Sequence, residues 1–156
     1  MGRSRLRVEV EFASSLDGLP PKRLFVDWIR AALPADACGE VAVRVVDEAE
    51  SAALNERYRG RRGATNVLAF ESDPDTAVLD AVPPIGDLVI CAAVVEREAR
   101  EQHKPALAHW AHIVIHGALH LVGYDHDSAR DADSMESKER EVLARFGYGD
   151  PYAPPA

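Results

Sequence analysis

The sequence is poor in cysteine and has no long apolar run. Its two cysteines, Cys38 and Cys91, lie far apart, and neither has the close partner of a CxxC pair. A disulfide framework and a cysteine metal motif are therefore excluded. The longest apolar run, residues 88–95, is far shorter than the roughly 20 residues of a membrane helix. The start of the chain also lacks the apolar stretch of a secretory signal, so we expect a cytoplasmic protein with reduced thiols.

An excess of positive charge is also missing. The 156 residues contain 18 Lys and Arg against 26 Asp and Glu, for a formal net charge of −8. Such a chain does not coat nucleic acid by bulk charge, because neutralising phosphates requires Lys and Arg. The net charge does not exclude a local basic site. The apolar fraction of 47% is typical of globular proteins. The length fits one domain.

Hydrophobic periodicity predicts strands and helices in mixed order. Alternation with a period of two indicates strands, and apolar residues three or four apart indicate helices. We expect strands near 6–12, 41–45, 67–70 and 88–91, and helices near 21–34, 47–58, 92–102, 105–122 and 128–146. This order predicts one α+β domain over 1–147, with a small mixed sheet whose strand order the sequence does not give. Proline and glycine predict an exposed connection at 72–84 and a frayed tail at 148–156.

The histidines are the most informative feature. Five of the six lie close together, at His109, His112, His116, His120 and His126. His116 and His120 are four apart, so they project from one face of the predicted helix and can reach one ion. Gly123 is suited to end that helix, which allows the chain to return His126 as a third ligand. A lone helical histidine is more often a core residue, but this combination predicts a metal site.

Three histidines without a fourth protein ligand are typical of a catalytic metal site. The open position admits water, and three neutral ligands leave the full charge of the ion to attract an anionic substrate. Imidazole ligands favour zinc, although nickel or copper would also bind. We expect one zinc ion held by His116, His120 and His126. His112 is expected to be structural or to lie beside the site, and His109 is expected at the surface.

The ligand spacing is that of the metzincin peptidases, HExxHxxGxxH. Position 117 is glycine here, where those enzymes carry the glutamate that acts as general base. Glycine cannot take a proton from water. A metallopeptidase is therefore disfavoured unless Asp125, Asp127 or Glu136 replaces that glutamate.

The segment HGALHLVGYDH strongly resembles the signature H-G-x-L-H-L-x-G-Y-D-H of the YbeY family of bacterial endoribonucleases. LNERYRGRRGATNVLAFE at 54–71 and IGDLVIC at 85–91 are similar to two further blocks of that family, and the resemblance covers roughly 40–152. Departures are small, with Ala69 replacing the commoner serine and Ile85 the commoner leucine. The resemblance implies a zincin-like α+β fold with a mixed four-stranded sheet and zinc bound by the three histidines named above.

The resemblance also implies an activity and partners. Proteins of the family that this chain resembles are single-strand-specific, metal-dependent endoribonucleases. They act in maturation of the 3′ end of 16S rRNA and in ribosome quality control. They are associated with the small ribosomal subunit and with an Era-type GTPase. An arginine important for activity in the family matches Arg59 here, which we therefore expect to be catalytic.

The residues themselves support a phosphate site. Arg57, Arg59, Arg61 and Arg62 form the densest positive cluster of the chain, in a segment with glycines. Guanidinium groups bind phosphate well, so Arg57, Arg61 and Arg62 are candidate substrate-binding residues, with a solvated loop as the alternative. No general base is evident, and either water or the RNA 2′-OH could be the nucleophile. Two rival functions stay open, a metallopeptidase and a non-catalytic ribosome-assembly factor stabilised by zinc.

Overall fold

Among the residues that the structure describes, four strands form a single mixed sheet. The computed structural model describes residues 5–72 and 83–153. The strands are β1 (Leu6–Phe12), β2 (Gly39–Val46), β3 (Val67–Glu71) and β4 (Pro84–Cys91), in the spatial order β1-β2-β4-β3. β2 pairs in parallel with β1 and β4, whereas β3 pairs antiparallel with β4. The expected mixed four-stranded sheet is confirmed, and the strand order is new information.

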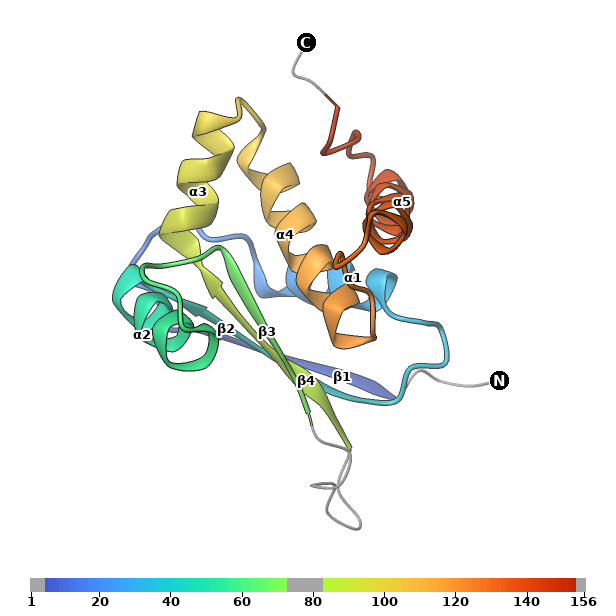
Figure 1. Ribbon diagram of the computed structural model, residues 1–156, viewed down its shortest axis with the longest axis horizontal. Helices are drawn as coiled ribbons and strands as arrows, with labels where there is room; N and C mark the ends of the chain where they lie inside the picture. Colours follow the sequence, from blue (N-terminus) through green and yellow to red (C-terminus); the bar gives the residue numbers. More distant parts are fainter. Residues whose placement is uncertain (1–4, 73–82, 154–156) are drawn as a thin grey trace.

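In the described part of the chain, five helices pack around this sheet, and they are divided unequally between its two faces. They are α1 (Lys22–Ala32), α2 (Glu48–Arg59), α3 (Ala92–Glu101), α4 (Ala106–Leu121) and α5 (Ala129–Arg145). Figure 1 shows α1, α4 and α5 together on one side of the sheet and α2 near its other side. The predicted α+β architecture is confirmed. Within the described residues, no helix is long and apolar enough to cross a membrane.

The main core lies between the sheet and α4. Val41, Val43 and Val45 of β2 alternate toward this side and are almost fully buried there. The ring of Phe25 on α1 lies 5.7 Å from the ring of Trp110 on α4. Because α4 is covered by the sheet and by three helices, most of its circumference is apolar and buried. This burial fixes α4 firmly with respect to the sheet.

Gly117 allows α4 to approach the sheet closely. A Cβ atom at this position would lie 2.9 Å from Leu88 Cδ2 and 3.0 Å from Val67 Cγ2. Both distances are shorter than ordinary carbon contacts of about 3.5–4.0 Å. A glycine at this position is therefore explained by packing, and a longer side chain would have to enter the interface between helix and sheet.

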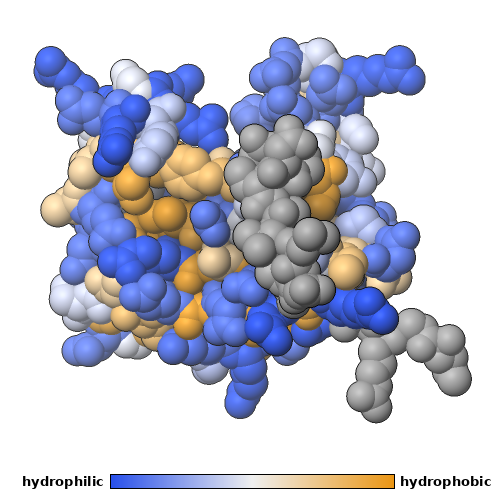
Figure 2. Space-filling view, turned by 90° about the horizontal axis from the view of Figure 1, so that it is seen from below, coloured by the Kyte–Doolittle hydropathy of each residue, from blue (hydrophilic) through white to orange (hydrophobic). Residues whose placement is uncertain are grey.

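The opposite face of the sheet carries a groove of about 430 Å³. Figure 2 shows this side, where apolar side chains lie in a hollow bordered by hydrophilic ones. Glu9, Glu11 and Asp87 contribute acidic groups to the groove, and Arg44 is engaged by Glu11 at 2.7 Å and by Glu50 at 2.6 Å. RNA phosphates would be repelled by this excess of carboxylates, so this face is unsuited to them.

Several boundaries differ from the expectations. β4 begins at Pro84 rather than Leu88, and Arg59 is the last residue of α2 rather than part of a loop. Gly60 then ends α2 with φ of 65°, a left-handed conformation that glycine adopts without strain. The connection expected at 72–84 falls mainly on residues 73–82, which lie outside the described part of the chain.

The segment after Gly147 was expected to be frayed, but residues 148–152 pack against the protein. Tyr148 contacts the main core, and Lys104 Nζ donates a hydrogen bond to the Pro151 carbonyl at 2.6 Å. The hydroxyl of Tyr152 reaches a buried carboxylate of α5. Its aromatic residues and these hydrogen bonds outweigh the composition from which fraying was predicted.

Candidate metal centre

Helix α4 presents one histidine on each of four successive turns. His109, His112, His116 and His120 follow one another at intervals of three or four residues. Consecutive rings in this row have centroids 6.1, 6.2 and 4.7 Å apart. The row therefore follows directly from the helical repeat, and its closest pair is His116 and His120.

His126 joins this pair from outside the helix. Gly123 has φ of 100°, which lets the chain reverse after α4 as expected. The ring of His126 then lies with its centroid 5.2 Å from that of His120 and 5.9 Å from that of His116. The structure thus brings the rings of all three predicted ligands together.

Potential ligand atoms nevertheless form two separate groups. Within 4.8 Å of one another lie atoms of His112, His116 and Glu139, and in the second group those of His120, Asp125 and His126. The first group is largely enclosed, with the Glu139 side chain fully buried, whereas the side chain of His126 is 60% exposed. Either group has enough donor atoms to hold an ion, and His116 of the first group has its ring centroid 4.7 Å from that of His120 in the second.

Glu139 is the residue that the sequence analysis missed. Its Oε2 accepts hydrogen bonds from His112 Nε2 at 2.9 Å and from His116 Nδ1 at 3.1 Å. Its Oε1 accepts one from the Tyr152 hydroxyl at 2.6 Å. The signal that could have revealed it is a carboxylate on the apolar stripe of α5, between Met135 and Val142.

These contacts keep Glu139 ionised. Burial raises its pKa, but the hydrogen bonds from His112, His116 and Tyr152 outweigh that effect and bring the pKa to about 2. The pKa of Tyr152 is raised, first by the burial of its hydroxyl and then by the hydrogen bond that this hydroxyl donates to Glu139. An ionised carboxylate can only accept, so the two histidine nitrogens that face it carry hydrogen.

The environment of His120 favours the neutral form that metals bind. Burial lowers its pKa, and the neighbouring rings of His116 and His126 lower it further. A neutral imidazole retains a lone pair for coordination. His120 therefore has the protonation state of a ligand near neutral pH.

Two carboxylates border the exposed side of the histidines. The backbone amide of His126 donates to Asp125 Oδ1 at 2.7 Å, and this hydrogen bond lowers the pKa of Asp125. The pKa of Asp127 is raised, chiefly by its hydrogen bond with Asp125. Asp125 and Asp127 thus interact with each other beside the exposed side chain of His126.

His109 is not at the surface, which corrects the sequence-based expectation. Only 3% of its side chain is exposed, and its Nε2 lies 3.0 Å from Glu98 Oε1. Glu98 also accepts hydrogen bonds from the side-chain amide of Asn66. This network links α3, α4 and the segment before β3, so His109 has a structural role that periodicity alone did not reveal.

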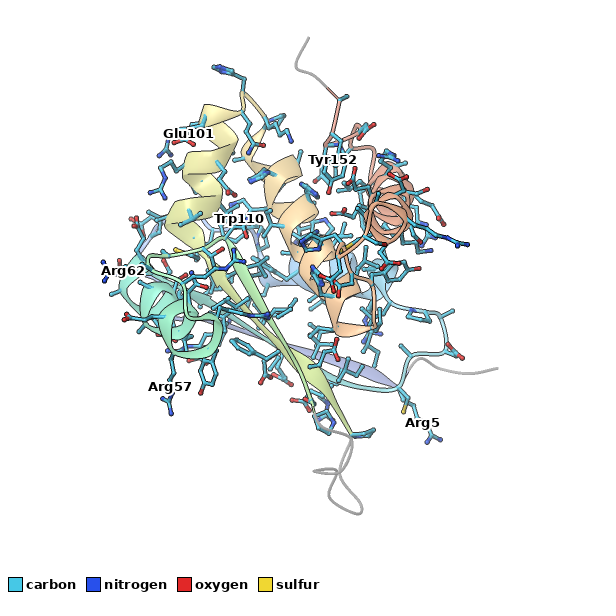
Figure 3. The ribbon with its side chains drawn as sticks, in the orientation of Figure 1. Arg5, Arg57, Arg62, Glu101, Trp110 and Tyr152 are labelled. Atoms are coloured by element: carbon cyan, nitrogen blue, oxygen red, sulfur yellow. The ribbon has the colours of Figure 1, made fainter. Side chains whose placement is uncertain are left out.

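The arginine cluster belongs to the end of α2 and the segment after it. Arg59 donates to the Ala69 carbonyl of β3 at 2.9 Å, and the Arg57 guanidinium lies 5.3 Å from the centre of the Tyr58 ring. Figure 3 shows Arg57 and Arg62 extending outward from the α2 side, whereas Tyr152 lies near α4 and α5.

Among the described residues, no hydrogen bond joins Arg57, Arg59, Arg61 or Arg62 to a histidine. Arg59 is nevertheless attached to β3, whose Val67 packs against Gly117 beside His116. The structure thus anchors Arg59 to β3, the strand that packs against α4 at Gly117.

Comparisons with known proteins agree on one family. Residues 20–147 match the family model described as endoribonuclease YbeY. A protein of that name from Alkalilimnicola ehrlichii is 54% identical over 86% of this chain and 83% of its own length. One from Xanthomonas campestris is 49% identical over 97% of this chain and 96% of its own length.

A solved structure supports the fold. The solution structure of a Thermotoga maritima protein matches with a TM-score of 0.56 and 23% identity, over 95% of this chain and 99% of that one. The family model spans most of the chain, and the two relatives share about half of their aligned residues with it. This chain therefore belongs to the YbeY family.

Proposed function

We propose that this protein is a zinc-dependent endoribonuclease that cuts single-stranded RNA. The observation that carries the proposal is the convergence of His116, His120 and His126, whose ring centroids lie 4.7–5.9 Å apart on a partly exposed surface. The names of the relatives supply the reaction class, cleavage of RNA phosphodiester bonds. Three neutral imidazoles and an accessible position are what a catalytic zinc site requires.

The donor set fits an ion held by the three histidines better than one held by the enclosed group. At Glu139, the facing nitrogens of His112 and His116 both carry hydrogen, which an ion would have to displace. That group is also closed to a polymer, because the Glu139 side chain is fully buried. His120 and the exposed His126 are open to a phosphate, and His116 keeps its Nε2 for coordination.

Different residues of this chain would have different roles in RNA cleavage. Bound zinc would supply Lewis acidity toward a phosphate oxygen and lower the pKa of water. The Arg59 guanidinium, released from the Ala69 carbonyl, would stabilise charge on the phosphate in the transition state. Arg57, Arg61 and Arg62 would hold flanking phosphates. Asp125, whose Oδ1 lies 3.8 Å from His126 Nδ1, and its neighbour Asp127 are candidates to accept the proton of the nucleophile.

The nucleophile is either water or the RNA 2′-OH, and the products separate the two routes. A 2′,3′-cyclic phosphate at the cut would require attack by the 2′-OH. A free phosphate monoester formed directly would require attack by water. Mass spectrometry of the products from a short single-stranded RNA distinguishes these ends.

We further propose that the substrate is ribosomal RNA. The enzyme would act in the cytoplasm on the 3′ end of 16S rRNA and in ribosome quality control, with the small ribosomal subunit and an Era-type GTPase as partners. A net charge of −8 disfavours indiscriminate RNA binding, which leaves substrate choice to a local site or to these partners. Depletion of the protein should then leave unprocessed 16S 3′ ends, and normal ends would contradict this role.

The decisive experiment measures zinc content and RNA cleavage on the same preparations. We expect one zinc per wild-type chain and metal-dependent cleavage of single-stranded RNA, with both lost in His120→Ala. The matched control is His103→Asn, because His103 lies outside the histidine row and its φ of 55° suits asparagine. Stoichiometric zinc without cleavage of any RNA would favour the assembly-factor alternative instead. Zinc uptake by His120→Ala combined with its loss in His112→Ala would move the ion to the enclosed group.

The peptidase alternative has little structural support. A glutamate at position 117 would point into the packed interface with Leu88 and Val67. A peptidase mechanism would therefore need another carboxylate, such as Asp125, to act as the general base in place of the missing glutamate. Zinc-dependent turnover of casein by the wild-type chain would revive this alternative.

A further inference from the structure

Glu139 receives hydrogen bonds from two separate parts of the chain. His112 and His116 of α4 both donate to Oε2, and Tyr152 of the C-terminal segment donates to Oε1. The carboxylate is completely buried, although α5, which carries it, is otherwise strongly polar. A buried carboxylate is costly unless its acceptors are satisfied, so these contacts are specific rather than incidental.

The hydrogen bond at 3.1 Å decides which nitrogen of His116 can bind a metal. Oε2 of the Glu139 carboxylate faces Nδ1 of His116 at hydrogen-bond distance, and a carboxylate oxygen accepts, which places the hydrogen on Nδ1. In a neutral imidazole the other nitrogen, Nε2, then holds the free lone pair. Because ring orientation and tautomer are both set by the same contact, Glu139 prepares His116 as a ligand.

We propose that Glu139 is a positioning residue of the metal site, which fixes His116 for coordination through Nε2, and that Tyr152 holds Glu139 in place. The proposal rests on the zinc site proposed above. Carboxylates that accept from a ligating histidine raise the basicity of the ligand, and their loss typically weakens metal binding by about 10–100-fold. Glu139 does not touch the substrate, so it acts only through His116.

Tyr152 makes the carboxylate rigid. Its hydroxyl bonds Oε1 at 2.6 Å, and its ring packs edge-on against that of His112 with centroids 5.4 Å apart. Lys104 fixes the same segment through the Pro151 carbonyl. The C-terminal segment is therefore attached to α4, to α5 and to Lys104, and it contributes one of the three hydrogen bonds that hold the Glu139 carboxylate.

The first test measures zinc affinity by competition with a chelator. Glu139→Gln retains the shape of the side chain but loses its charge, and we expect its zinc dissociation constant to rise about 10-fold or more. Tyr152→Phe removes only the hydroxyl, and we expect a rise that is measurable but smaller than that of Glu139→Gln, because the carboxylate itself stays in place. The control is Glu141→Gln, which neutralises an exposed carboxylate on the same helix that pairs with Arg145. It should stay within about twofold of wild type.

The second test reads the tautomer of His116 directly. Nitrogen-15 spectra of the wild-type chain labelled at histidine should place the hydrogen of His116 on Nδ1, with and without zinc. A hydrogen on Nε2 would overturn the proposal even if Glu139→Gln fails to fold. Zinc affinities of Glu139→Gln and Tyr152→Phe that both equal that of wild type would also overturn it.

The experiments distinguish failure of the proposed zinc site from failure of the positioning role of Glu139. If the wild-type chain takes up no zinc, the zinc site itself is wrong. The tautomer of His116 in the metal-free chain still decides whether Glu139 orients it. If zinc binds and RNA is cut but the variants match wild type, only the positioning role is lost.

Discussion

Tyr152 donates a hydrogen bond to Glu139 Oε1 over 2.6 Å, and Glu139 in turn contacts His116 through its other oxygen. Two contacts thus connect the C-terminal segment to a predicted metal ligand. The three residues joined by these contacts come from separate parts of the sequence, namely α4, α5 and the segment after α5. The surroundings of the histidines are therefore assembled by packing rather than by one continuous motif.

Substitution of Arg59 should separate catalysis from metal binding. We expect Arg59→Ala to lower the rate of RNA cleavage by about 100-fold, as loss of one group that stabilises transition-state charge typically does. Its zinc content should equal that of wild type, since Arg59 contacts Ala69 and no histidine. Arg5→Ala, which removes the same charge from an exposed residue before β1, is the control. A normal cleavage rate in Arg59→Ala would contradict the assigned role.

Introducing the peptidase glutamate should damage the fold without creating a peptidase. Gly117→Glu would force a charged side chain against Leu88 and Val67, and we expect the free energy of unfolding to fall by about 3 kcal/mol or more. Leu107→Glu adds the same residue at an exposed position of α4 and should cost less than about 1 kcal/mol. Urea unfolding measures the free energy of unfolding of both variants. Casein turnover by a stable Gly117→Glu protein would refute the packing argument.

Zinc should stabilise the folded chain. A ligand that binds only the folded state, at a free concentration 100 times its dissociation constant, raises the free energy of unfolding by about 2.7 kcal/mol. We expect the melting temperature to fall when zinc is chelated and to recover when it is restored. His126→Ala should melt at the same temperature with and without zinc. An undiminished response to zinc in that variant would exclude His126 as a ligand.

Glu98 should make stability depend on pH in the acid range. Burial raises its pKa, but hydrogen bonds from His109 and Asn66 reverse this and bring the pKa below its ordinary value of 4.5. A carboxyl group whose pKa is lower in the folded state stabilises fully above the unfolded pKa. That contribution is lost as the pH falls through the folded value.

The variant Glu98→Gln tests this sign. At pH 7 it should be less stable than wild type by about 1–3 kcal/mol, because hydrogen bonds to the charge are lost. The difference should shrink as the pH is lowered below 4.5. Glu101→Gln, at an exposed residue of the same helix, should show no such dependence. A difference that stays constant from pH 7 to pH 3 would show that the charge of Glu98 is not responsible.

Local patterns were sufficient for the elements and for the metal-ligand candidates. Alternating apolar residues mark β2, and the spacing of four between His116 and His120 fixes their common face, because strand and helix repeats are properties of the backbone. Gly123 marked the reversal that returns His126. These features depend on neighbours within a few residues, so the sequence determines them by itself.

Only the tertiary structure decided the environment of those residues. Periodicity gave no sign that His109 is buried against Glu98, or that Tyr152 packs on the site instead of fraying. Glu139 reads as one more charge on a polar helix until α5 packs beside α4 and places it between two histidines. The physical reason is that burial and hydrogen bonding between distant segments depend on how helices and sheet pack, and short-range patterns carry no record of that packing.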